Sequence, residues 1–208
     1  MIRAKHHFFL YPFFRWYSKL SIRRNFHEVR MTGGFQDRNL PLLLIANHFS
    51  WWDGIFVNFL NMKCFFKRYH FMVHENHISN FWFFKYLGAF SVQKNSISII
   101  DTFTYIRELL QDNSNLVLVF PQGEIRSQHS TELIFEKGIE KIISIIDNEI
   151  QIVFIVNLID YFSHPKPTLY SYMKEFISND AGISAIEKSY NGFYKECLEE
   201  HRKMVDRL

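Results

Sequence analysis

Short apolar runs alternate with amphipathic stretches along most of the chain, starting near residue 40. Five runs have the length and the aliphatic or aromatic character of buried strands: Leu42–Ala46, Phe71–His74, Ala89–Val92, Leu116–Phe120 and Ile152–Val156. A sixth run, Thr168–Tyr172, lies just behind Pro165 and Pro167. Because proline in strands is confined to edges and ends, we expect this run at an edge of the sheet.

Helix-like stretches lie between these runs, over residues 52–61, 80–87, 97–111, 132–147 and 183–205. The stretch from 97 follows Asn95 and Ser96, which are good helix caps, and its apolar residues recur at helical spacing: Ile97, Ile100, Phe103, Ile106 and Leu110. Such alternation of strands and helices predicts an α/β fold with a mostly parallel or mixed central sheet flanked by helices. The length of 208 residues favours one domain, which we place at 31–208.

Residues 1–30 differ from this domain in charge and in aromatic content. They hold seven Lys or Arg and one acidic residue, whereas the whole chain has a formal net charge of only +3. Seven aromatic residues occur within 8–17, but the apolar run from Phe8 to Phe14 is far shorter than the roughly 20 residues of a membrane span. We therefore predict an amphipathic segment on an anionic membrane surface, as a monotopic or peripheral protein on the cytoplasmic face. The alternative is a first helix packed on the core.

Other features of the composition exclude several classes of protein. Two cysteines, Cys64 and Cys197, cannot form a disulfide framework or a cysteine-built zinc site, which favours a reducing compartment. The excess of basic residues is confined to the first 30 residues, and this argues against a nucleic acid as partner.

The first candidate for chemistry is the stretch from Ala46 to Gly54, where a predicted strand ends in Asn47 and His48 and Asp53 follows five positions later. The two side chains can meet if His48 lies on the turn after the strand and Asp53 lies in the first turn of the next helix. The carboxylate would then fix the imidazole tautomer and leave the second ring nitrogen free as a base. A structural histidine at a strand end is the alternative.

The second candidate is the turn after the run Leu116–Phe120, which reads Pro121-Gln122-Gly123-Glu124-Ile125-Arg126. Such a turn can present backbone N–H groups and a cation to an anionic ligand or an oxyanion. Both candidates follow strands, and open α/β sheets bind ligands at the carboxyl ends of their strands.

These residues resemble the motifs of the lysophospholipid acyltransferases of the 1-acylglycerol-3-phosphate acyltransferase type. Asn47, His48 and Asp53 match the first motif, Asn-His-x4-Asp, and Phe120–Ser127 approximates the third, Phe-Pro-Glu-Gly-Thr-Arg-Ser. Gly88–Lys94 is similar to the second motif, with Lys94 in the place of its Arg, and Phe135–Gly138 is similar to a Phe-Lys-x-Gly element that opens a helix. Ile152–Val156 corresponds loosely to the fourth motif but lacks its proline.

The resemblance implies acyl transfer from an acyl thioester, carried by coenzyme A or acyl carrier protein, to a hydroxyl of a lysophospholipid or another lipid. In that mechanism His48 is the general base and Asp53 orients it, with no other cofactor and no metal. The resemblance further implies that Lys94, Gln122, Gly123, Glu124 and Arg126 bind substrate and that Asn47, Gly88 and Pro121 support them. Gln122 replaces the motif's Glu, and Arg126 lies one position later than the motif's Arg, so the identity of the acceptor stays open.

Three alternatives to a glycerolipid acyltransferase follow from the residues. The acceptor can be another hydroxylated lipid, such as a glycolipid, an aminolipid or a pigment. A metal-dependent hydrolase would use the histidines of His74-Glu75-Asn76-His77 or the pair His6-His7, but no third ligand stands at a suitable spacing. An inactive protein that keeps the fold is suggested by Gln122, whereas the intact His48 and Asp53 argue against it.

Overall fold

The computed structural model describes residues 1–92, 98–136, 138–144, 146, 149–177 and 183–206. Its helices are α1 (Leu10–Asn25), α2 (Asp53–Leu60), α3 (Glu75–Asn80), α4 (Ser98–Leu109), α5 (Gly138–Ser144) and α6 (Ile183–Arg202). Its strands are β1 (Val29–Gly34), β2 (Leu42–Ala46), β3 (Arg68–His74), β4 (Ala89–Val92), β5 (Asn115–Val119), β6 (Gln151–Asp160) and β7 (Thr168–Phe176). Shorter helical turns follow α2 at Asn61–Phe65, precede β4 at Trp82–Tyr86 and follow α6 at Lys203–Asp206.

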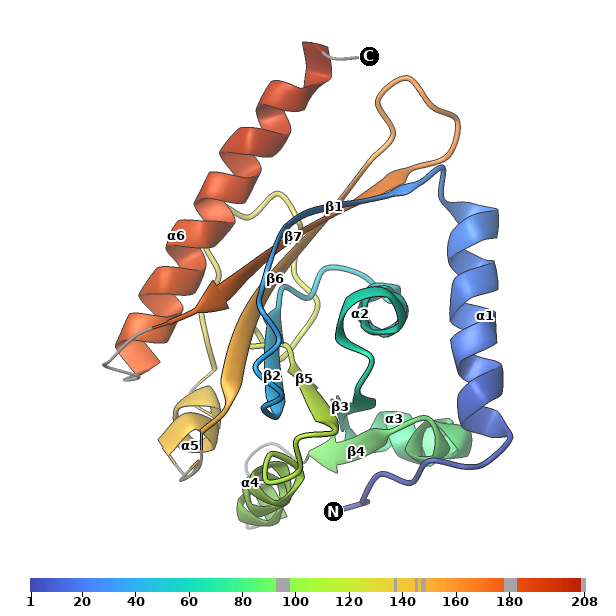
Figure 1. The fold of residues 1–208 in the computed structure, drawn as a ribbon, viewed down its shortest axis with the longest axis vertical. Helices are drawn as coiled ribbons and strands as arrows, with labels where there is room; N and C mark the ends of the chain where they lie inside the picture. Colours follow the sequence, from blue (N-terminus) through green and yellow to red (C-terminus); the bar gives the residue numbers. More distant parts are fainter. Residues whose placement is uncertain (93–97, 137, 145, 147–148, 178–182, 207–208) are drawn as a thin grey trace.

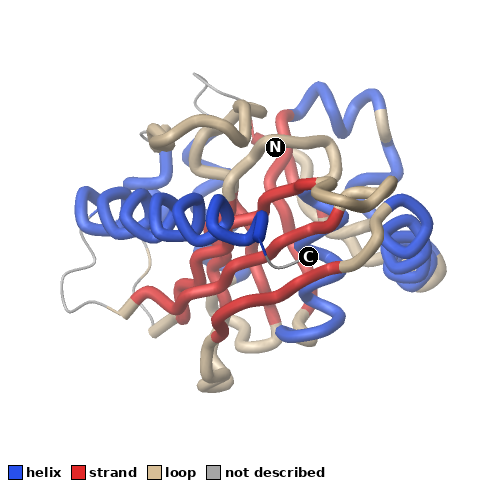
Figure 2. Tube along the Cα trace, turned by 90° about the horizontal axis from the view of Figure 1, so that it is seen from above, coloured by secondary structure: helices blue, strands red, loops and turns tan. Residues whose placement is uncertain are grey.

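The seven strands form one mixed sheet in the order β1-β7-β6-β2-β5-β3-β4. The five strands from β6 to β4 are parallel, β7 runs antiparallel to β6, and β1 pairs in parallel with β7. Figure 1 shows α4, α5 and α6 on one side of the sheet and α1, α2 and α3 on the other. Seen from above in Figure 2, the strands form a twisted layer with helices outside it. The predicted single-domain α/β fold is therefore confirmed.

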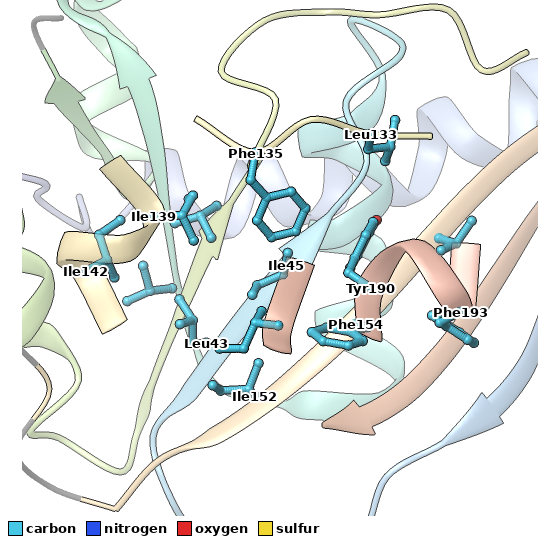
Figure 3. Close-up of a cluster of buried hydrophobic side chains, with 14 of the residues drawn as sticks. Leu43, Ile45, Leu133, Phe135, Ile139, Ile142, Ile152, Phe154, Tyr190 and Phe193 are labelled. Atoms are coloured by element: carbon cyan, nitrogen blue, oxygen red, sulfur yellow. The ribbon is translucent and has the colours of Figure 1, made fainter. Parts of the chain in front are cut away.

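The core consists of two apolar layers, one on each face of the sheet. Every residue of β2 is buried, and its side chains alternate between the layers. Leu43 and Ile45 meet α5 and α6 (Figure 3), while Leu42 and Leu44 meet the residues of α2. A strand covered on both faces reads as a continuous apolar run, which is why the sequence pattern revealed the central strands.

Three details differ from the sequence-based predictions. Thr168–Tyr172 belongs to β7, which is not an edge strand, because β1 pairs along its outer side. The helix predicted at 80–87 is instead α3 followed by a 3-10 turn, Trp82–Tyr86. The helix predicted at 132–147 starts later in the structure, since residues 131–136 are not helical and α5 begins at Gly138. Residues Asn95–Ile97 of the predicted helix start lie outside the described residues.

The first residues run along the end of the sheet before α1 begins. Lys5 and His7 donate backbone hydrogen bonds to Lys85 and Tyr86, at 2.6 and 3.1 Å. The side chain of His6 turns inward, where its Nε2–H donates to the carbonyl oxygen of Tyr69 at 2.9 Å. α1 then crosses α2, and the buried Ser18 hydroxyl accepts a hydrogen bond from Asn58 of α2 at 2.9 Å. The N-terminal segment thus contacts the domain through one side of α1.

The buried ring of His70 on β3 makes the stability of the fold sensitive to acid. The rings of His6 and His70 meet edge to face with centroids 4.7 Å apart, and His70 Nε2 hydrogen-bonds to Asn115. Burial, with His6 and Arg68 nearby, lowers the pKa of His70 to about 3. Burial also lowers the pKa of His6. Folding therefore favours the neutral rings.

We expect the free energy of unfolding to fall as pH drops below about 6.5, the pKa of an unfolded histidine, and to keep falling toward pH 3. By pH 5 the loss from His70 should reach about 2 kcal/mol, at 1.36 kcal/mol per pH unit. Urea unfolding of the wild type and of His70→Gln, which keeps a donor for Asn115, measures this loss. Parallel pH profiles for the two proteins would contradict the expectation.

Candidate active site

The candidate residues lie at the carboxyl ends of β2 and β5, two adjacent parallel strands in the middle of the sheet. Asn47 and His48 come directly after β2, and Pro121 comes two residues after the end of β5. Ligands of open α/β sheets bind at this edge because the loops there diverge and leave backbone groups unpaired. The structure thus brings the first and third motifs together, although more than 70 residues separate them in the chain.

His48 and Asp53 form a direct pair, as the motif predicted. Asp53 Oδ2 lies 2.7 Å from His48 Nδ1, and the same oxygen accepts the backbone N–H groups of Phe49 and Ser50 at 2.8 and 2.9 Å. A carboxylate only accepts hydrogen bonds, so the proton lies on Nδ1 and the Nε2 atom of His48 is free to act as a base. The side chain of Asp53 is fully buried, whereas 24% of the His48 side chain is exposed.

Burial raises the pKa of Asp53 above the usual aspartate value, and the hydrogen bonds from His48, Ser50 and Phe49 offset part of that rise. Its Oδ1 atom is buried without a hydrogen-bond partner in the described part of the chain. The carboxylate is therefore held by one oxygen in a poorly solvated place. A buried negative charge of this kind attracts an imidazolium strongly, because little water screens it.

Asn47 anchors the strand end that carries His48. Its side-chain Oδ1 accepts the backbone N–H of Asn157, and its Nδ2 donates to the backbone carbonyl of Asn157, both at 2.8 Å. The side chain of Asn47 thereby takes the place of a strand partner for β6. The amide of Asn47 in the first motif is a structural clamp, and no local sequence pattern predicts its partner Asn157, which lies 110 residues away.

The turn after β5 holds His48 on two sides. The side-chain Oε1 of Gln122, which is 6% exposed, accepts the backbone N–H of His48 at 2.6 Å. The ring of Phe120 stacks on the imidazole, with centroids 4.2 Å apart and planes 15° from parallel. The backbone N–H of Arg126 donates to the carbonyl oxygen of His48 at 2.9 Å. Gln122 thus connects the first and third motifs through its side chain. Nothing in the sequence indicated that Gln122 binds the backbone of His48.

The polar groups of this turn are largely engaged with one another. Gly123 has a positive φ of +66°, and its N–H donates to the carbonyl of Phe120 at 3.1 Å, so that N–H is not free to bind a ligand. The guanidinium of Arg126 is paired with the carboxylate of Glu124, and both side chains are more than half exposed. Pro121 is buried, and its carbonyl accepts the N–H of Glu136 at 2.8 Å. Arg126 therefore carries an exposed, Glu124-paired cation on a residue whose backbone is bonded to His48.

One candidate from the second motif, Gly88, does not join this group. Gly88 precedes β4, so it lies at the amino end of that strand, opposite the edge where His48 stands. There its φ is +99°, and a Cβ would come within 2.1 Å of the Tyr69 carbonyl oxygen, so only glycine fits. Lys94 lies outside the described residues.

Side chains of α6 hold the segment that follows the turn, and Phe135 of this segment packs on the ring of Tyr190 in α6 (Figure 3). The amide of Asn191 bonds both backbone groups of Leu133 at 2.8 Å, and Glu187 accepts the N–H of Phe135 at 3.0 Å. The hydroxyl of Tyr194 donates to the carbonyl of Gln128 at 3.1 Å. These contacts replace the hydrogen bonds that a helix over 132–136 would have made. They explain why the predicted helix begins only at Gly138.

Neither a metal site nor a membrane span is found among the described residues. Within them no group of three or more His, Cys, Asp or Glu side chains is placed to hold a metal ion, and the side chain of His77 is not described. No helix in the described ranges is both long enough and apolar enough to cross a bilayer.

A fold with parallel central strands, carrying a paired histidine and aspartate at their carboxyl edge, agrees with the class of enzyme that the motifs predicted. A family model described as Acyltransferase matches residues 24–156, which is more than half of the chain. The chain therefore belongs to this family, that of the lysophospholipid and glycerol-3-phosphate acyltransferases, and the resemblance is confirmed. Comparison with curated proteins gives no match. Membership supports acyl transfer as the reaction.

Proposed function

We propose that the protein transfers a fatty acyl group from an acyl thioester to a hydroxyl of a membrane lipid. The observation that carries this proposal is the His48–Asp53 pair, with Nδ1 bonded to the buried carboxylate and a partly exposed ring on the turn after β2. A neutral alcohol attacks a carbonyl poorly, and a base with a pKa near neutrality accelerates the attack by removing the proton. The thioester is coenzyme A-bound or carried by acyl carrier protein.

In the proposed step, Nε2 of His48 takes the proton of the acceptor hydroxyl as its oxygen attacks the thioester carbonyl carbon. A tetrahedral oxyanion forms, the carbon–sulfur bond breaks, and the protonated imidazole returns its proton to the departing thiolate. Asp53 stabilises the imidazolium between these events. The products are an oxygen ester and a free thiol.

The exposed guanidinium of Arg126 is the group that we assign to a negative charge on the acceptor, such as a phosphate. Its present partner, the exposed carboxylate of Glu124, can be displaced at little cost because exposed ion pairs contribute about 0–1 kcal/mol. The buried amide of Gln122 serves the same site by holding the backbone of His48.

Incubation of the purified protein with acyl-CoA or acyl carrier protein thioesters and a panel of lipid acceptors tests the proposal. The panel includes a lysophospholipid, a glycolipid, an aminolipid and a pigment alcohol. Free thiol should appear together with an ester product whose mass gains one acyl group, in the presence of one acceptor class. An absence of thiol release with every acceptor would favour the alternative that the protein is an inactive member of the family.

The membrane part of the proposal is supported by the exposed side of α1. Phe9, Phe13 and Trp16 lie there with 57–70% of their surfaces exposed, next to the basic residues of the same segment. The aromatic surface continues through ring contacts from Phe9 to His7, from His7 to Tyr86 and from Tyr86 to Trp82. Aromatic rings beside Lys and Arg suit the headgroup region of an anionic membrane, and we place the protein on its cytoplasmic face.

Binding to anionic vesicles should weaken at high salt without vanishing, because salt screens the basic residues but not the burial of the rings. Replacing Phe9, Phe13 and Trp16 together by Ser should lower the affinity at every salt concentration, as measured by vesicle sedimentation. The control replaces Ile134 and Ile177 by Ser, since both are 81% exposed and lie away from this surface. Equal losses of affinity in the two variants would contradict a specific role of α1.

A further inference from the structure

α6 lies beyond the segment that the family model matches, yet one of its side chains reaches the strand that carries His48. Tyr190 is fully buried between the sheet and the helix (Figure 3). Its hydroxyl donates to the backbone carbonyl of Ile155 on β6 at 2.9 Å. The hydroxyl thus holds β6 directly beside the end of β2.

The place of these contacts in the sheet is the point where β2 and β6 separate. Ala46, the last residue of β2, is paired with Ile155. One residue further, the side chain of Asn47 bridges to the backbone of Asn157. The Tyr190 hydroxyl on Ile155 and the Asn47 amide on Asn157 thus hold β6 on either side of the point where its direct pairing with β2 ends. The backbone of β2 can therefore leave the sheet at His48 and turn toward Asp53.

Electrostatics and the remaining contacts of α6 agree with this arrangement. Burial raises the pKa of Tyr190 well above its usual value, so the hydroxyl stays a donor, and the negative charge of Asp53 contributes to that rise. One turn of helix on either side, Glu187 and Tyr194 hold the segment after the third motif. α6 thus contacts both loops that shape the surroundings of His48.

We propose that Tyr190 is a positioning residue of the acyl-transfer site, whose hydroxyl holds the carbonyl of Ile155 beside the end of β2 and thereby fixes the backbone that carries His48. It touches no reacting atom, and the proposal rests on the proposed role of His48 as the base. A shift of about 1 Å in a catalytic group can lower a rate by 10²-fold, so a small movement of this strand end is enough to matter.

The test compares Tyr190→Phe, which removes only the hydroxyl, with the matched control Tyr172→Phe. Tyr172 is also buried, and its hydroxyl lies 3.4 Å from His201 of α6. Among the described residues this hydroxyl makes no hydrogen bond with His48, Asp53 or the turn after β5. We expect kcat to fall about 10- to 100-fold in Tyr190→Phe, with little change in KM, because the base is misplaced while the acceptor contacts remain. Tyr172→Phe should keep kcat within about twofold of the wild-type value, although its Tm should shift by about as much as that of Tyr190→Phe.

A proton resonance provides a readout that does not depend on turnover. The Nδ1–H proton of His48, bonded to Asp53 at 2.7 Å, should give a strongly downfield signal in the wild type and in Tyr172→Phe. The signal should broaden or disappear in Tyr190→Phe. An unchanged signal, or a loss of kcat no larger than in Tyr172→Phe, would overturn the proposal.

A second variant guards against simple unfolding of Tyr190→Phe. Tyr194→Phe removes only the hydroxyl bonded to Gln128 in the segment after the third motif. It should also lower kcat with little change in KM, and the loss of kcat should be smaller than in Tyr190→Phe. If both α6 variants behave like Tyr172→Phe, α6 has no positioning role. If the wild type transfers no acyl group, the proposed function fails, while the His48 proton signal still decides whether Tyr190 orders the pair.

Discussion

His48→Ala should lower the rate of acyl transfer by at least about 10²–10⁴-fold, the usual contribution of a general base. The imidazole is the only described base on the turn after β2, and its bond to Asp53 leaves Nε2 without a proton. The thioester and the acceptor should still bind, so the loss belongs to kcat and not to KM.

The fold should survive this change, because the ring of His48 is partly exposed and its main packing contact is one stacked phenylalanine, Phe120. The matched control is His164→Ala, since His164 is also half-buried and stacked on a ring, that of His27, with centroids 3.7 Å apart. Thiol release measured with a saturating acceptor compares the two. Activity of His48→Ala within tenfold of the wild type would rule out the general-base mechanism.

Asp53→Asn should lower kcat by about 10⁴-fold, the loss that the same change causes in a Ser-His-Asp triad. A neutral amide cannot stabilise the imidazolium that forms when His48 takes the proton. The amide oxygen can still accept the backbone N–H groups of Phe49 and Ser50, so the local fold does not depend on the charge.

Stability distinguishes this loss from unfolding. Because burial raises the pKa of Asp53, the folded protein disfavours its charge, and a neutral amide of the same shape avoids that cost. The free energy of unfolding at neutral pH should therefore stay within about 1 kcal/mol of the wild type or rise, even as activity disappears. A variant that lost activity only in proportion to its loss of folded protein would show that Asp53 has a purely structural role.

The sequence predicted the central strands because they are buried on both faces, as β2 and β5 are. β1 was missed because only Val29 in it is even partly buried, and an edge strand of this kind carries no apolar run. β7 was expected at an edge because Pro165 and Pro167 precede it, but both prolines lie in the loop before the strand and leave its outer side free to pair with β1. The segment 132–136 has helical periodicity, but Asn191 and Glu187 bind its backbone, and a local pattern cannot reveal partners more than 50 residues away.

Contacts between residues of one motif could be predicted from the sequence, whereas contacts between different motifs could not. The spacing of His48 and Asp53 predicted their contact, which the structure confirms. The partners of Asn47, Gln122 and Phe120 could not be predicted, because each contact joins two strand ends that are distant in the chain. A turn can be recognised from local residues, but the atom that a buried amide faces depends on the order of the strands.

The pairing of β1 with β7 has a consequence for the order in which the chain folds. Val29 meets Leu169, so the first strand acquires its partner only after about 140 further residues have been synthesised. Closing so long a loop is entropically costly and slow, and a chain emerging from the ribosome cannot do it early. The parallel strands β2 to β5 can assemble first, while β1 waits without its partner. Residues 1–7 and α1, which contact β3, β4 and α2, can already take their places before the sheet is complete.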